Sequence, residues 1–154
     1  MAEPRSTKPL PAQRRVPTAT VVVTVLLACY WTALFYGTHI KIPPDLLPEA
    51  RNIDKLAHLA SYAVLGALFM SLRATRGVYP WSSVIARWFV LAGYGAFDEI
   101  SQLLVNRNAD PMDWLADVIG VAVGLGSVTF VVWRFRRSTN PAHDDAHLSK
   151  ILPS

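Results

Sequence analysis

The chain has 154 residues, of which 52% are hydrophobic and only 17% charged, and its mean hydropathy is positive. This composition is typical of a small membrane protein rather than of a soluble globule. The net charge is +4, but the basic residues stand in short clusters beside apolar runs, so we expect no nucleic-acid partner. The single cysteine, Cys29, excludes an intramolecular disulfide and a cysteine metal cluster.

Four apolar segments are predicted to cross a membrane as helices, because a crossing requires roughly 20 predominantly apolar residues. They are residues 18–37, 56–72, 82–105 and 114–133. The first segment contains no charge, whereas the third is interrupted by Arg87 near its start and by Asp98 and Glu99 near its end. The sequence therefore predicts an all-α membrane protein whose four-helix membrane domain spans residues 18–135.

The first segment also has features of a signal peptide, because basic residues precede it and "LLAC" at 26–29 is similar to a lipoprotein cleavage site. However, the apolar run continues through "YWTALFYG" without a small-residue site that would close it. We therefore expect this segment to remain as the first membrane helix.

The distribution of basic residues predicts the orientation. With four crossings both termini lie on one side of the membrane, and ten Lys and Arg residues flank that side against four on the other. The ten are Arg5, Lys8, Arg14, Arg15, Arg73, Arg76, Arg134, Arg136, Arg137 and Lys150, and the four are Lys41, Arg51, Lys55 and Arg107. We therefore expect both termini in the cytoplasm, with disordered tails over residues 1–17 and 136–154.

Polar residues follow one face of each of the three later helices. At about 1.5 Å per residue, these faces all lie in the outer third to half of the membrane. The faces carry Asp54, His58, Ser61 and Tyr62 in the second helix, Tyr94, Asp98 and Gln102 in the third, and Asp113, Asp117, Gly120 and Gly124 in the fourth. Glu99 lies beside the face of the third helix, and Lys55 lies at the start of the second. Ionisable side chains inside a membrane are costly and are often functional. The sequence thus predicts a polar site that is open to the outer face.

Several of these residues also have a purely structural interpretation. Asp54, Lys55 and Asp113 could simply cap or anchor helix ends, since an acid suits a helix N-terminus. Asp98, Asp117 and His58 lie deeper, where a functional role and a structural polar network both remain open. Gly120 and Gly124 form a small-xxx-small face, for which we expect helix packing.

The chemistry of this site is left open by the residues themselves. Carboxylates and an imidazole suit a divalent cation, for which Asp98, Glu99 and Asp113 are the candidate ligands. Alternatively, His58 could act as a general acid or base on a lipid-linked substrate. The sequence contains no HExxH, no calcium-loop pattern, no Gly-x-Ser-x-Gly and no phosphate-binding loop, so we favour a non-catalytic role.

Two stretches, "DKLAHLASYAVLG" at 54–66 and "FDEISQLLVNRNADPMDWLADVIGVAVG" at 97–124, resemble the VanZ-like family of bacterial membrane proteins. The matching positions are Asp54, Lys55, His58, Tyr62, Asp98, Glu99, Gln102, Arg107, Asp113, Asp117, Gly120 and Gly124. This sequence has Asp117 where many relatives carry Asn, and it lacks the Pro-Gly expected before Arg107.

The resemblance implies a multi-pass protein of the bacterial cytoplasmic membrane. The family is named for an accessory protein associated with reduced sensitivity to teicoplanin, so an effect on glycopeptide sensitivity is expected. Our preferred hypothesis is that the outer polar site binds a lipid headgroup, a lipid-linked cell-wall precursor or a glycopeptide. The alternative is an intramembrane enzyme, either metal-dependent or not. A transporter is less favoured because four crossings without an inverted repeat give little room for alternating access, although an oligomer would relieve this.

Overall fold

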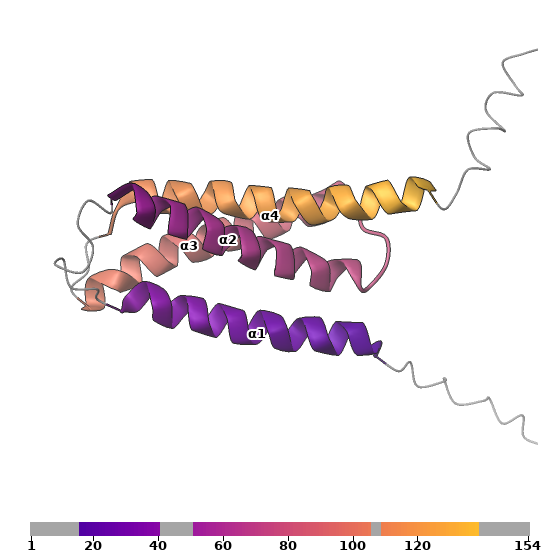
Figure 1. The fold of residues 1–154 in the computed structure, drawn as a ribbon, viewed down its shortest axis with the longest axis horizontal. Helices are drawn as coiled ribbons and strands as arrows, with labels where there is room; N and C mark the ends of the chain where they lie inside the picture. The colour runs from indigo at the N-terminus through magenta and orange to yellow at the C-terminus, as the bar shows by residue number, and fades with distance from the viewer. Residues whose placement is uncertain (1–15, 41–50, 106–108, 139–154) are drawn as a thin grey trace, which may run out of the picture.

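The computed structural model describes residues 16–40, 51–105 and 109–138, and this part of the chain is helical throughout, apart from short connections (Figure 1). Four long helices follow one another: α1 (Thr18–His39), α2 (Arg51–Ala74), α3 (Trp81–Gln102) and α4 (Pro111–Ser138). A short 3-10 helix, η2 (Leu103–Val105), extends α3. The predicted all-α fold is confirmed. The predicted tails lie largely outside the described residues, and α4 continues through the expected boundary at 136.

Proline and glycine set the helix boundaries. The carbonyls of Pro17 and Pro80 accept the first hydrogen bonds of α1 and α3, at 2.9 and 3.0 Å. Pro111 is the first residue of α4, a position where its missing N–H costs nothing. Gly77 ends the turn after α2 with a φ of +98°, a conformation that a side chain would strain.

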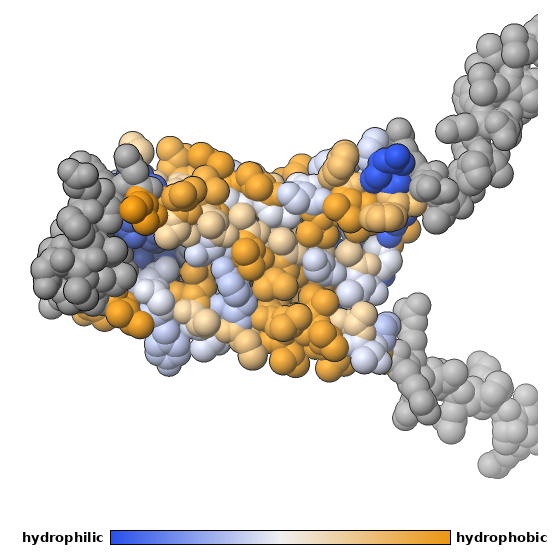
Figure 2. Space-filling model, in the orientation of Figure 1, coloured by the Kyte–Doolittle hydropathy of each residue, from blue (hydrophilic) through white to orange (hydrophobic). Residues whose placement is uncertain are grey.

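Three of the helical segments are long and apolar enough to cross a membrane: Thr18–His39, Ile53–Ala74 and Pro111–Arg136. They correspond to the first, second and fourth crossings predicted from the sequence. Residues of the third predicted crossing form α3 and η2, but α3 is not in this group, because polar and charged side chains lower its hydropathy. Hydrophobic residues cover much of the visible middle of the bundle, as expected of a surface in contact with lipid (Figure 2).

Helices α2 and α4 lie side by side and pack closely (Figure 1). A Cβ at Gly120 would overlap the carbonyl oxygen of Leu59, and a Cβ at Gly124 would overlap that of Ala63. From the other side, a Cβ at Gly66 would lie only 2.9 Å from the carbonyl oxygen of Val121. Small residues thus let the two backbones approach along a seam, as at other membrane helix interfaces.

Helix α1 is joined to the rest of the bundle by hydrogen bonds along its length. They are Thr20 to Thr75 at 3.0 Å, Tyr30 to the carbonyl of Ser61 at 3.0 Å, Thr38 to Asp98 at 3.1 Å and His39 to Ser101 at 2.9 Å. The last two place the C-terminal end of α1 beside the end of α3. This position matters for the site, because it adds α1 to the three helices that the sequence brings together.

Candidate functional site

Buried polar side chains gather at the end of the bundle where α2 and α4 begin and where α1 and α3 end (Figure 1). Among the described residues, only Thr20 is a buried polar residue at the other end. We call this group the buried polar cluster. It consists of His58, Tyr62, Asp98, Glu99, Ser101, Gln102, Asp113 and Asp117.

His58 of α2 forms the centre of the cluster. Its Nδ1 lies 3.0 Å from Oδ1 of Asp117 on α4, and the two side chains are 6% and 0% exposed. Because a carboxylate can only accept, Nδ1 donates this hydrogen bond. Oε1 of Glu99, on α3, lies 4.0 Å from the same nitrogen. One imidazole therefore contacts acids from two other helices.

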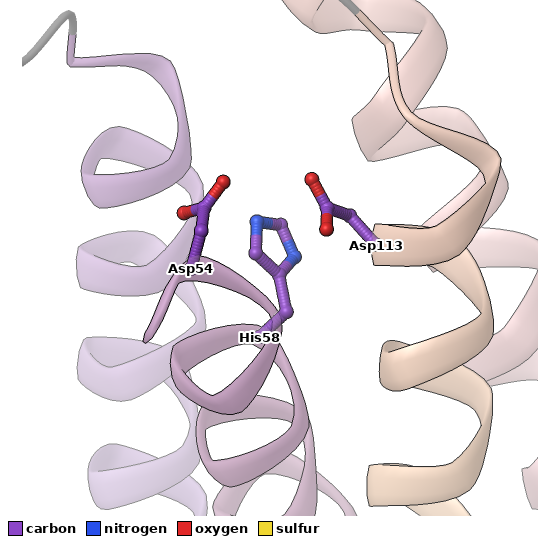
Figure 3. A group of neighbouring side chains, drawn as sticks. All are labelled: Asp54, His58 and Asp113. Carbon is purple, nitrogen blue, oxygen red and sulfur yellow. The ribbon is translucent and has the colours of Figure 1, made fainter. Parts of the chain in front are cut away.

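The other side of the imidazole faces a second pair of acids. Figure 3 shows the His58 ring between the carboxylates of Asp54 and Asp113, with a ring nitrogen pointing toward the gap between them. Asp54 is exposed, whereas Asp113 is buried. Two groups of three residues can therefore offer ligand atoms to a metal ion. Within each group, one ligand atom of each residue lies within 4.8 Å of the others, and His58 belongs to both groups. They are Asp54, His58 and Asp113, and His58, Glu99 and Asp117.

Lys55 connects the beginning of α2 to the beginning of α4. Its Nζ donates to Oδ2 of Asp110 at 2.7 Å and to Oδ1 of Asp113 at 2.9 Å. Asp110 also caps α4, since its Oδ1 accepts from the backbone N–H of Met112 at 2.9 Å. The backbone N–H of Asp110 donates to Oε2 of Glu99 at 3.0 Å. Asp110 therefore links three helices, a role the sequence analysis did not assign, although an acid directly before a helix-starting proline signals a cap.

Asp98 lies on the α1 side of the cluster and is fully buried. Its Oδ1 accepts a hydrogen bond of 3.1 Å from Thr38 and lies 3.9 Å from Nδ1 of His39. Ser101 donates to the backbone carbonyl of Asp98 at 2.8 Å and bonds Nε2 of His39 at 2.9 Å. The sequence analysis missed Thr38 and His39 because it ended the first crossing at residue 37. The available signal was the pair of polar residues that directly follows the first apolar segment.

Among the described residues, several buried polar atoms of the cluster have no hydrogen-bond partner. They are Oε1 of Glu99, Oδ2 of Asp117 and Nε2 of Gln102. The hydroxyl of Tyr62 and the carboxylate of Asp98 interact with each other. An unpaired buried polar group costs about 1–3 kcal/mol, and more if it is charged. The excess of acceptors means that the cluster is suited to a ligand bringing positive charge or hydrogen-bond donors.

The predicted site residues are thus mostly brought together. Arg107 lies outside the described residues. The predicted cation ligands Asp98, Glu99 and Asp113 remain a prediction, although the two groups whose atoms converge include Glu99 and Asp113 separately and do not include Asp98. Gly120 and Gly124 follow Asp117 along α4 and pack against α2.

Comparison with known proteins supports the family resemblance seen in the sequence motifs. A family model described as VanZ/LLP1 matches residues 9–134, which is most of the chain. Comparison with curated proteins and with solved structures found no match. The match covers all the residues of the buried polar cluster and all of α1, α2 and α3, and it confirms the resemblance seen in the sequence. The chain belongs to the VanZ/LLP1 family.

Proposed function

We propose that this chain is a four-crossing protein of the bacterial cytoplasmic membrane whose buried polar cluster binds the polar group of an envelope lipid or lipid-linked cell-wall precursor. In this proposal both termini are cytoplasmic and the cluster lies near the outer surface. The placement of basic residues supports this orientation, because Arg73, Arg76, Arg134 and Arg136 lie at or near the end opposite the cluster. Cytoplasmic flanks of membrane helices carry such an excess of Lys and Arg.

The observation that carries the proposal is the excess of buried carboxylates in the cluster, where Oε1 of Glu99 and Oδ2 of Asp117 have no hydrogen-bond partner among the described residues. A folded protein rarely leaves buried acceptors without donors unless another molecule supplies them. Sugar hydroxyls, amide N–H groups and ammonium groups of envelope lipids are suitable donors. A ligand that made these bonds would relieve the cost of burying the acids.

The surroundings of the cluster favour a ligand with acyl or prenyl chains. Large apolar side chains beside it are exposed on three helices and on η2. They are Leu56 on α2, Ile100 on α3, Leu104 on η2 and Leu115 on α4. Lipid chains can pack on these residues while the polar group reaches the cluster. Binding a precursor in this way would change how a lipoglycopeptide such as teicoplanin reaches its target, as the family name implies.

An intramembrane enzyme acting on a lipid-linked substrate is the second candidate. The observation that favours it is the position of His58, which lies between acids on both sides of its ring. A histidine held between carboxylates is suited to transferring protons. The two candidates differ in outcome, because an enzyme would release an altered lipid and a binding protein would release the same lipid.

Native mass spectrometry would test binding directly. The full chain is released from bilayer discs containing phosphatidylethanolamine and a lipid-linked disaccharide–peptide precursor, and the mass of any retained lipid is measured. We expect wild type to retain a lipid, and Asp98→Asn and Asp117→Asn to lose it. Thr20→Val is the control, because Thr20 is buried and polar but lies at the opposite end. Equal retention by wild type and both acid variants would contradict the proposal.

A further inference from the structure

The group formed by His58, Glu99 and Asp117 is short of positive charge. It holds two carboxylates and one imidazole, with side chains that are 6%, 7% and 0% exposed. Burying carboxylates away from water is expensive unless a partner neutralises them. Among the described residues, the nearby cation Lys55 is already bound to Asp110 and Asp113, further toward the end of the bundle.

The geometry of the three side chains suits a metal ion. They come from three different helices, and one ligand atom of each lies within 4.8 Å of the others. Nδ1 of His58 is 3.0 Å from Asp117 and 4.0 Å from Glu99. Ligand atoms bound tetrahedrally at 2.0–2.2 Å from a metal are about 3.4 Å apart, so binding would require side-chain shifts on the order of 1 Å.

An unpaired oxygen of Glu99 faces the histidine. Oε1 of Glu99 lies 4.0 Å from Nδ1 of His58 and has no hydrogen-bond partner among the described residues. Its lone pairs are free on a side chain that is more than nine-tenths buried. A divalent cation bound between this oxygen, Nδ1 of His58 and Asp117 would satisfy Oε1 and would offset the charge of both carboxylates, which one hydrogen-bond donor cannot do.

The second pair of acids completes the arrangement. A histidine that ligates a metal usually donates its other ring N–H to a carboxylate, which fixes the ring. With Nδ1 on the metal, the remaining N–H of His58 would lie between Asp54 and Asp113 (Figure 3). Both sides of the ring therefore have an acidic partner in the metal-bound state.

We propose that His58, Glu99 and Asp117 bind one divalent transition-metal ion of the Zn²⁺ or Mn²⁺ type. The mixed nitrogen and oxygen ligands favour such ions over Mg²⁺ and Ca²⁺, which prefer oxygen ligands alone. The inference deepens the proposed function and rests on it only in using the same cluster as a ligand site. With the ion bound, the cluster would also suit the phosphate of an envelope lipid, because three protein ligands would leave a coordination position free.

Metal retention by the purified protein would test this site. The full chain carrying His143→Ala and His147→Ala, which removes tail histidines outside the described residues, is stripped with a chelator and dialysed against Zn²⁺ or Mn²⁺. Bound metal is then measured by mass spectrometry. We expect one ion per chain, a loss of affinity of about ten-fold or more in Glu99→Gln and Asp117→Asn, and retention in Asp98→Asn. Asp98→Asn is a matched control because Asp98 is a buried acid beside Glu99 but outside the ligand group.

Three outcomes of the metal measurement would overturn the proposed site. No metal in the wild-type chain, or equal metal in all variants, would overturn the inference. Loss in Asp54→Asn together with retention in Glu99→Gln would also overturn it, since the other group would then be the site. If the acid variants do not accumulate, the visible absorption of Co²⁺ added to the wild-type chain still tests for a metal site. The intense visible absorption of four-coordinate Co²⁺ supports the site, and an unchanged spectrum of aqueous Co²⁺ overturns it.

The metal result and the lipid result can be told apart. A chain that binds Zn²⁺ or Mn²⁺ at these residues but retains no lipid contradicts the proposed function and leaves the metal site standing. A chain that retains lipid but no metal contradicts only the metal site.

Discussion

His58 on α2 and Asp117 on α4 form a hydrogen bond of 3.0 Å across the same seam that Gly120 and Gly124 close. Gly120 follows Asp117 by less than one helical turn. Because the glycines let the backbones of α2 and α4 approach, the two polar side chains meet with both almost fully buried. The packing of this helix pair therefore sets the geometry of the buried polar cluster.

Gly124→Ala is predicted to destabilise the bundle. The added Cβ would overlap the carbonyl oxygen of Ala63, so α2 and α4 must move apart. Overpacking of this kind costs about 1–3 kcal/mol. The free energy of unfolding in mixed detergent micelles measures the effect.

Gly126→Ala on the same helix is the control for this change. A Cβ at Gly126 meets nothing within 4 Å, and alanine favours a helix over glycine by about 1 kcal/mol. We expect equal or higher stability. A similar loss of stability in both variants would show that the α2–α4 seam is not the cause.

Thr38→Val is predicted to destabilise the protein through Asp98. The valine keeps the shape of threonine but removes the hydroxyl that donates to Oδ1 of Asp98 at 3.1 Å. After this change the buried carboxylate would be left with the hydroxyl of Tyr62 and with His39, whose Nδ1 is 3.9 Å away. The expected cost is about 1–3 kcal/mol.

A double-mutant cycle with Asp98→Asn would check this coupling. The neutral amide costs less to bury than a carboxylate, so Thr38→Val should cost clearly less in the Asp98→Asn chain than in wild type. Unfolding free energies of the four chains give the comparison. Because the amide oxygen of Asn can still accept from Thr38, additive effects of the two changes would mean that the charge of Asp98 does not strengthen this hydrogen bond.

Cysteine labelling is predicted to place the two ends of α3 on opposite sides of the membrane. In a Cys29→Ser chain, Leu104→Cys follows α3 and Val78→Cys precedes it, and Leu104 and Val78 are 86% and 79% exposed. In intact cells, a membrane-impermeant maleimide should label residue 104 and should reach residue 78 only after permeabilisation. The native Cys29 must be removed because it is exposed. Labelling of both positions from outside would rule out a crossing by α3.

Much of the fold could be predicted from the sequence because long apolar runs are bounded by prolines and charges. All four helices lie close to the predicted segments, and α1 and α3 each follow a proline. Helical periodicity also placed His58 and Asp117 on faces that meet. Whether α3 crosses is harder to predict, because its charged residues are costly in lipid unless packing shields them, and Asp98 and Glu99 are buried here.

The partners of the cluster that escaped prediction depend on contacts between helices. Thr38 and His39 contact it only because α1 packs with its end beside α3. Asp110 contacts it because its backbone N–H donates to Glu99, while its side chain binds Lys55. Periodicity within one helix carries no information about such partners. They become visible only when the helices are assembled.

The claim that the buried polar cluster is the working part of this protein is tested most directly by teicoplanin susceptibility in a sensitive bacterial host. Wild type, His58→Ala, Asp117→Asn and the control Thr20→Val are compared at matched membrane levels. We predict that wild type and the control raise the inhibitory concentration of teicoplanin, and that both cluster variants return it to the level of the host alone. Cluster variants as protective as wild type, or a wild type without effect, would contradict the account.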